Sequence, residues 1–203
     1  MVAPSVHVPY REFVDRSAKH DVIIKAIPGV EPRLQRLLAE LTMMRLFDDF
    51  QEAIAGIALR LACGRPYGDG VMPVLLTSPA RSTAGARTLF ETHNRRKHQY
   101  CKWSKASYIR ETTREVLDER DRFYTACLKQ SLAISEMQAV RNRIAHRNAK
   151  SRKAFDVVLR RHYGASVNAV TPGLFLISPR FTNTQLERYL TTCRVLTKEC
   201  SGS

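Results

Sequence analysis

The sequence lacks the features that mark membrane, secreted and zinc-binding proteins. No apolar run approaches the roughly 20 residues that a membrane-spanning helix needs, and the stretch MVAPSVHVPYREFVD has no signal-peptide core. The five cysteines, at positions 63, 101, 127, 193 and 200, are widely spaced and form no CxxC pair. We therefore expect a cytoplasmic protein with reduced thiols, without a disulfide framework, a metal site or a membrane partner.

Acidic residues are also scarce. Nineteen Asp and Glu stand against 33 Lys and Arg, which gives a net charge of +14. The electrostatic field of such a chain attracts polyanions, so nucleic acid is the first partner to consider. A helical domain that neutralises an acidic protein is another interpretation of the same charge.

The sequence has no internal repeat or low-complexity tract, and β-type alternation is nearly absent, whereas apolar residues recur with helical spacing. We predict an all-α fold: a helical bundle with a central long helix pair, extra short helices and a C-terminal helix. A length of 203 residues suits a single domain over residues 1–203. The segment GRPYGDG is not followed by Gly-Lys-Ser/Thr, so no phosphate loop and no cofactor are predicted.

Caps and breakers set the expected helix ends. Helices are predicted over residues 10–26, from Pro32 to just before Gly64, and over 84–93, 104–117, 119–146 and 183–198. The Gly-, Pro- and Ser-rich residues 64–83 read as a long connection, and residues 84–108 as a short helix with a basic insertion.

The helix that begins at Pro32 has two apolar sides. One stripe comprises Met43, Phe47, Phe50, Ile54, Ile57 and Leu61. The opposite flank comprises Leu34, Leu37, Leu41, Met44, Ala55, Leu59 and Ala62. Both sides are expected to be covered by other helices. Asp48 and Glu52 lie within the second flank and are candidate half-buried acids.

The stretch HNRRKHQYCKWSKASY, residues 93–108, mixes cations with aromatic rings. Arg95, Arg96, Lys97 and Trp103 are candidate RNA contacts, because cations hold phosphates and rings stack on unpaired bases. A solvated basic loop with its aromatic residues anchored in the core is the structural alternative. His20 and His162 are read as surface or capping residues.

An arginine interrupts the apolar stripe of the 119–146 helix. Phe123, Ala126, Cys127, Ile134, Met137, Ile144 and Ala145 share one face, with Arg141 at its centre. A buried guanidinium needs an anionic partner, which Asp48, Glu52 or a substrate phosphate can supply. Helical spacing places Asn142 and His146 one turn apart beside Arg141.

These three residue types suit RNA cleavage by the RNA's own 2′-hydroxyl. Histidine transfers protons near neutral pH, arginine stabilises charge that develops on a phosphate, and an amide can position either group. No metal is required by such chemistry. Arg143, Arg147 and Lys150 surround the candidates and are expected to contact RNA through its phosphates.

The segment VRNRIAHRN, residues 140–148, resembles the Rx4-6H motif of the HEPN superfamily. RLFDDFQEAIAGIALRL, residues 45–61, looks like that family's second helix, which carries an acid that Glu52 or Asp48 matches. FLISPRFTNTQLERYLTTCRVL, residues 175–196, resembles the closing segment of the RiboL-PSP-type branch. In one branch a tyrosine two positions after the histidine is modified, and here Asn148 stands at that position.

The resemblance implies a homodimer with a composite ribonuclease site in which Arg141 and His146 are the catalytic pair and Asn142 is auxiliary. It implies metal-independent endonucleolytic cleavage that leaves 2′,3′-cyclic phosphate and 5′-hydroxyl ends. Such domains serve as toxins of toxin-antitoxin systems or as effectors of phage defence and abortive infection, and they cut tRNA, rRNA or mRNA. Their activity is controlled by an antitoxin or a sensor protein. A non-catalytic RNA-binding or regulatory module that uses the same basic face remains the alternative.

Overall fold

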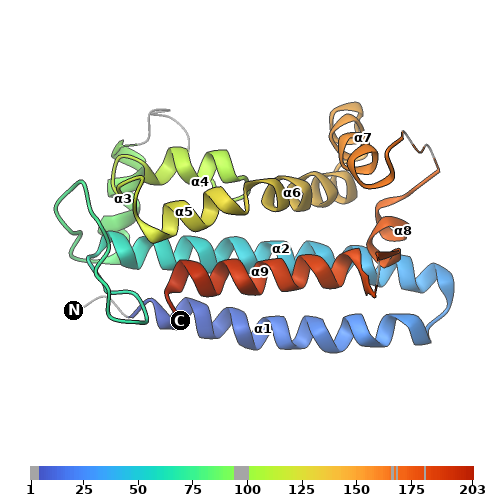
Figure 1. Cartoon of the computed structure of the whole chain (residues 1–203), viewed down its shortest axis with the longest axis horizontal. Helices are drawn as coiled ribbons and strands as arrows, with labels where there is room; N and C mark the ends of the chain where they lie inside the picture. The colour runs from blue at the N-terminus through green and yellow to red at the C-terminus, as the bar shows by residue number, and fades with distance from the viewer. Residues whose placement is uncertain (1–4, 94–100, 166, 168, 181) are drawn as a thin grey trace.

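A computed structural model of the protein describes residues 5–93, 101–165, 167, 169–180 and 182–203. Those residues form an all-α bundle, as predicted (Figure 1). The helices are α1 (His7–Ala26), η1 (Ile27–Gly29), α2 (Pro32–Ala62), α3 (Thr83–His93), α4 (Ala106–Thr113), α5 (Arg122–Lys129), α6 (Ser131–Ala145), α7 (Ala149–Tyr163), α8 (Pro172–Ile177) and α9 (Gln185–Ser201). Two short strands, β1 (Pro179–Arg180) and β2 (Asn183–Thr184), pair antiparallel just before α9.

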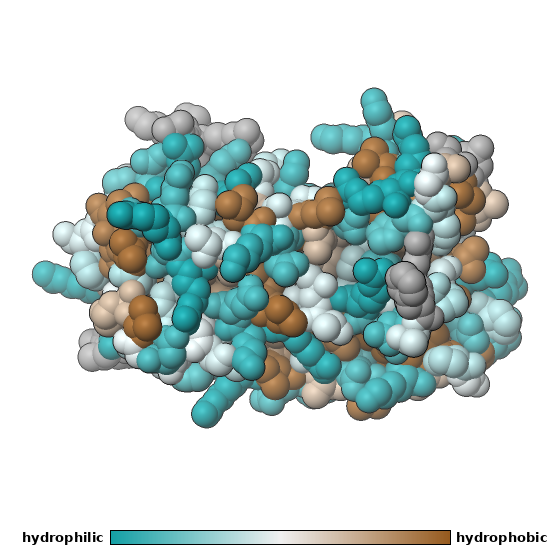
Figure 2. All heavy atoms as spheres, in the orientation of Figure 1, coloured by the Kyte–Doolittle hydropathy of each residue, from teal (hydrophilic) through white to brown (hydrophobic). Residues whose placement is uncertain are grey.

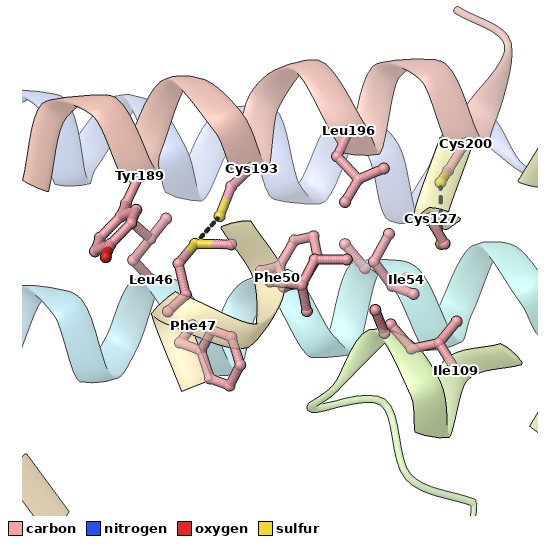
Figure 3. Close-up of a cluster of buried hydrophobic side chains, with 14 of the residues drawn as sticks. Leu46, Phe47, Phe50, Ile54, Ile109, Cys127, Tyr189, Cys193, Leu196 and Cys200 are labelled. Carbon is pink, nitrogen blue, oxygen red and sulfur yellow. Dashed lines mark hydrogen bonds between the residues drawn. The ribbon is translucent and has the colours of Figure 1, made fainter. Parts of the chain in front are cut away.

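Helix α2 is the central element, and its predicted stripe is fully buried. Met43, Phe47, Phe50, Ile54, Ile57 and Leu61 are each 0% exposed. Helices α1 and α9 run along one side of α2, and α6 packs on another (Figure 1). Side chains from α2, α4, α5 and α9 meet in this core, as the labelled residues of Figure 3 show.

The second apolar flank of α2 is covered only in part. Ala62 is buried and Met44, Ala55 and Leu59 are half-buried, but Leu34, Leu37 and Leu41 are 42%, 51% and 54% exposed. The expectation that both sides are covered is therefore wrong for the first half of this helix. Helix α8 packs on a different side there, where Gly173 N–H donates to Glu40. Periodicity marks a face as apolar but does not say whether another helix reaches it.

The helix predicted over 119–146 is two helices. The chain breaks at Gln130, where φ is −96° and ψ is 12°, so that α5 ends and α6 begins. Helix α5 packs on α4 and α9, whereas α6 packs on α2 and α7. The break lets the two halves follow different partners, and no proline or glycine in the sequence announces it.

The segment 64–82 contains no helix, as predicted, but it is tied to the bundle. Asp121 caps α5 by accepting from Phe123 N–H, and its carboxylate also accepts from the Tyr67 hydroxyl and from Val74 N–H. The Asp121 side chain is thereby buried. One acid thus anchors the long connection and starts a helix.

The final helix is preceded by a reciprocal cap. The Thr184 hydroxyl accepts from Glu187 N–H, and the Glu187 carboxylate accepts from Thr184 N–H. This pair sets the start of α9 within two residues of the predicted boundary.

Candidate functional site

The motif residues lie where α6 ends and the chain turns into α7. Helix α6 stops at Ala145, and His146 is extended, with φ −133° and ψ 107°. Asn148 caps α7 by accepting from Ser151 N–H at 2.8 Å, and the Ser151 hydroxyl donates to the carbonyl of His146. His146 N–H still donates to the Asn142 carbonyl at 2.9 Å, so the two residues lie one turn apart, but His146 is the last residue of that turn and the backbone leaves the helix there. His146 is exposed.

Arg141 reaches an acid of α2. Its Nη2 lies 3.6 Å from Oδ1 of Asp48, and the two side chains are 27% and 50% exposed. The pair is long for a direct charge-assisted bond. The Nε of Arg141 is buried and has no partner among the residues that the structure describes. That buried donor is closed to a ligand, but the side chain as a whole is 27% exposed, so the other donors of the guanidinium can reach an additional anion.

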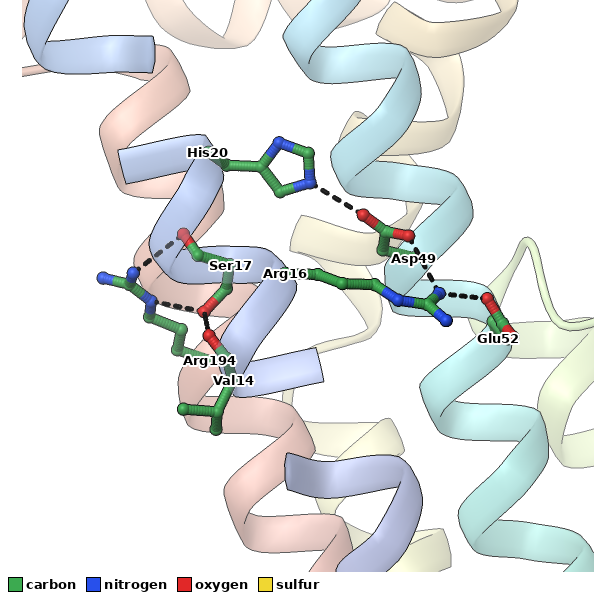
Figure 4. Close-up of polar contacts among 7 residues, drawn as sticks. All are labelled: Val14, Arg16, Ser17, His20, Asp49, Glu52 and Arg194. Carbon is green, nitrogen blue, oxygen red and sulfur yellow. Dashed lines mark hydrogen bonds and ion pairs between the residues drawn. The ribbon is translucent and has the colours of Figure 1, made fainter. Parts of the chain in front are cut away.

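Glu52 does not approach this arginine. It pairs with Arg16 of α1 and is 64% exposed, so Glu52 is not a half-buried acid, whereas Asp48 is 50% exposed and makes the ion pair with Arg141 that the sequence suggested. Their neighbour Asp49 is more deeply buried, at 21% exposed, and binds Arg16 and His20 (Figure 4). The helical phase of residue 49 matches that of the buried Ala53 and Leu46, and this was the signal that sequence analysis missed.

His20 is not a surface residue. It is 7% exposed, and its Nε2 lies 2.8 Å from Oδ2 of Asp49. A separate set of bonds joins α1 to α9, where Arg194 donates to the hydroxyl and carbonyl of Ser17 (Figure 4). These contacts join α1 to α2 and α9, so we assign them to the stability of the bundle.

Two open cavities meet at the motif. The larger, the α6–α7 cavity, has a volume of about 580 Å³, and the smaller, the Trp103 cavity, about 370 Å³. Asn142 and Tyr108 line both cavities. His146 lines only the larger and Arg141 only the smaller. The three candidates are therefore close together but are divided between two cavities within one chain.

The α6–α7 cavity lies between facing sides of those two helices, with α4 at its edge. In the space-filling view the upper outline dips between the positions of α4 and α7 (Figure 2). Its apolar wall includes Leu132, Ala139 and Val157, and its cations are Lys105, Lys150 and Arg161. A surface that combines apolar area with several cations suits a ligand with flat bases and phosphates.

Arg161 is held in place at this cavity. Its Nη1 lies 2.8 Å from Oε1 of Glu136, and His162 Nε2 lies 3.1 Å from the other carboxylate oxygen. Glu136 is 7% exposed, and the His162 side chain is 13% exposed, so the reading of His162 as a surface residue is wrong. The buried carboxylate fixes Arg161 while leaving it 44% exposed.

Of the other predicted RNA contacts, Arg147 and Lys150 are exposed and Arg143 is half-buried. Arg95, Arg96 and Lys97 lie outside the described residues. Trp103 is half-buried against Phe90, with ring centroids 5.8 Å apart and planes at 79°. This packing agrees with the alternative that the aromatic residues of 93–108 are anchored in the core, although Trp103 still lines the smaller cavity.

Within the described ranges, no three His, Cys, Asp or Glu side chains gather closely enough to hold a metal ion. No helix in that part of the chain is long and apolar enough to cross a bilayer. Comparison with models of protein families, with curated proteins and with solved structures finds no match for this chain.

Proposed function

We propose that this protein is a metal-independent endoribonuclease of the HEPN type that acts in the cytoplasm. The observation that carries the proposal is the position of Asn142, between a cavity that contains Arg141 and a cavity that contains His146. A phosphate held near Asn142 is flanked by a cation on one side and by a proton-transfer group on the other. The surrounding lysines and arginines supply attraction for RNA.

The reaction needs two proton transfers. The 2′-oxygen bonds to phosphorus while its proton leaves, and the bond from phosphorus to the 5′-oxygen breaks as that oxygen gains a proton. The products are a 2′,3′-cyclic phosphate and a 5′-hydroxyl. An exposed histidine at position 146 can perform one transfer, and Arg141 stabilises the charge that develops on phosphorus.

We further propose that two copies of the chain form a dimer whose two motifs share one composite site. The exposed Leu34, Leu37 and Leu41 are spaced as one stripe, and two identical stripes can cover each other about a two-fold axis. The same face continues along α2 through Met44 to Asp48, which holds Arg141. A second copy on this face therefore lies beside the site and supplies a second His146.

As a biological role we propose a toxin or phage-defence effector that cuts tRNA, rRNA or mRNA and is restrained by an antitoxin or sensor protein. An unrestrained ribonuclease would be harmful to its cell, which is the reason for such a partner. The alternative, an RNA-binding module without catalysis, uses the same cavities and cations. The two differ only in bond cleavage, so cleavage is the property to test.

The decisive experiment incubates purified wild-type protein and His146→Ala with a mixed RNA pool in the presence of EDTA. We expect the wild type to cut RNA to 2′,3′-cyclic phosphate ends, and His146→Ala to lose at least about a hundredfold in rate. His7→Ala, at a half-buried histidine in the first turn of α1, is the matched control and should cut like wild type. RNA binding without any cutting by the wild type supports the module instead.

The dimer is tested by light scattering. Leu37→Asp should convert the dimer to a monomer, because it places a charge in the centre of the exposed stripe. Val22→Asp, at a site that is 68% exposed on α1, should leave the dimer intact. A wild-type protein that stays monomeric at micromolar concentrations, with activity linear in protein, removes the composite site.

A further inference from the structure

We infer that the site binds two consecutive unpaired nucleotides, one base in the α6–α7 cavity and the next in the Trp103 cavity, with the connecting phosphate over Asn142. The inference rests on the proposed function for the identity of the ligand as RNA. It adds that the RNA is recognised as a single strand, by two neighbouring bases.

The dimensions of the two cavities support one nucleotide each. At about 580 and 370 Å³ both fall within the range of small-ligand sites. The two cavities do not join into one continuous channel. Tyr108 and Asn142 stand between them and line both. Ser104, which lines the smaller cavity, also accepts from the Gln138 side chain, which lines the larger one, at 3.2 Å. The partition is thus made by α6 together with the segment that enters α4.

The larger cavity offers both kinds of contact that a base requires. Ala139 and Val157 give an apolar surface for the ring, and Ser135, Gln138 and Asn142 carry donors and acceptors for its edge. Arg161, fixed by Glu136, stands at the same cavity as a cation for the backbone. Since its position is already restrained, little side-chain entropy is lost when a phosphate binds.

The smaller cavity has aromatic walls. Trp103 and Tyr108 line it together with Gln51, Phe47 lies fully buried behind them, and Lys102 and Arg141 carry its positive charge. Trp103 is braced edge-on by Phe90, so the ring is held in one orientation. Rigid aromatic walls beside cations are the usual arrangement for stacking a base of single-stranded RNA.

The arrangement excludes double-stranded RNA as a ligand. In a duplex, both faces of each base are stacked and its edge is paired, so consecutive bases cannot enter separate cavities. Two adjacent bases that are splayed apart must turn the phosphate between them outward. That phosphate then lies at the partition, with Arg141 on the Trp103 side and His146 on the other. The division of the motif between two cavities is explained by a ligand that occupies both.

The inference is tested by binding rather than by cutting. The probe is a fluorescein-labelled single-stranded octanucleotide pool with 2′-fluoro substitution, which lacks the attacking hydroxyl. Fluorescence anisotropy gives its affinity, and unlabelled mononucleotides, dinucleotides and blunt 2′-fluoro duplexes are competitors. We expect dinucleotides to compete at least tenfold better than mononucleotides, and duplexes to compete at least tenfold worse than single strands.

Two variants fill the cavities separately. Val157→Trp fills the larger, Gln51→Trp fills the smaller, and Val195→Trp on α9 is the control for adding an exposed indole. We expect each cavity variant to weaken binding at least tenfold, with the control unchanged and all three melting like wild type. The inference is overturned if the two cavity variants bind as tightly as the control. It is also overturned if the duplex competes as well as single strands, or if the wild-type protein does not bind the probe.

The two-nucleotide site and the ribonuclease activity can fail independently in these experiments. Cavity-dependent binding by a protein that never cuts RNA keeps the two-nucleotide site and rejects the ribonuclease. Cutting that is indifferent to both cavity variants keeps the ribonuclease and rejects the two-nucleotide site.

Discussion

The contact between Arg141 and Asp48 gives the site its most specific single-residue test. The carboxylate orients the guanidinium from 3.6 Å while both groups stay partly open to solvent. Asp48 is thus a positioning residue within the proposed mechanism, since it acts through Arg141.

We predict that Asp48→Asn lowers the cleavage rate of bound RNA by roughly tenfold, because the orientation of Arg141 is lost. RNA affinity should not fall, because the change removes a negative charge beside the phosphate. Single-turnover rates and anisotropy separate the two effects. Glu52→Gln is the matched control, since it removes the same charge one turn away without touching Arg141. Equal rates for the two variants would show that the orientation of Arg141 does not matter.

Buried thiols give a second residue-scale prediction. Burial raises the pKa of Cys193 and of Cys200, and the neighbouring Cys127 adds to the rise at Cys200. A raised pKa lowers the fraction of reactive thiolate at any pH below it. We expect both thiols to resist alkylation at pH 8 in the folded protein and all five cysteines to react after unfolding. Mass spectrometry of the alkylated protein checks this, and rapid native labelling of Cys193 contradicts the buried assignment.

Sequence reasoning predicted which residues gather at the site better than it predicted how they face. Arg141, Asn142 and His146 do lie together, because they follow one another at the end of a helix. The placement of His146 depends on Asn148 and Ser151, whose capping of α7 is decided by tertiary structure. His20 was misread because its partner, Asp49, lies on another helix.

At the level of elements, the predictable helices are those whose ends carry local signals. Pro32 and Gly64 bracket α2, and Thr184 with Glu187 begins α9. The break at Gln130 has no such signal and arises because α5 and α6 pack on different neighbours. Local chemistry thus predicts helix ends, and packing decides where an unbroken apolar pattern must bend.

The cap of α5 is the element-scale test. Asp121→Ala removes a helix cap and leaves the Tyr67 hydroxyl and Val74 N–H without their acceptor, while Phe123 N–H keeps only its bond to the Tyr67 oxygen. We expect a loss of about 2 to 4 kcal/mol in the free energy of unfolding. Thermal melting should show Tm lower by roughly 5 to 15 °C. Thr184→Ala, which removes a less buried cap, should lower the free energy of unfolding by only about 1 kcal/mol. Equal losses for the two variants would show that Asp121 adds no stability beyond its capping of α5.

For the whole molecule, the net charge of +14 predicts strong salt dependence of RNA binding. Each phosphate contact with single-stranded RNA contributes about −0.7 to the slope of log affinity against log salt. Arg147→Ala and Lys150→Ala should each reduce that slope by about this amount. Lys25→Ala, at an exposed cation of α1 outside both cavities, should not. Titrations from 50 to 200 mM salt measure the slopes, and identical slopes for the three variants exclude Arg147 and Lys150 as phosphate contacts.

The tied-down connection between α2 and α3 has a dynamic consequence. Its amides donate across the fold, from Leu76 to the carbonyl of Val116 at 2.9 Å and from Ala80 to that of Ala62 at 2.9 Å. Backbone amides bonded in this way exchange with solvent deuterium only when the bonds open. Because Asp121 joins the connection to α5, the segment 74–80 and the first turn of α5 should open as one cooperative unit. We therefore expect the amides of Val74, Leu76 and Ala80, in a stretch with the composition of a linker, to exchange as slowly as those of a helix.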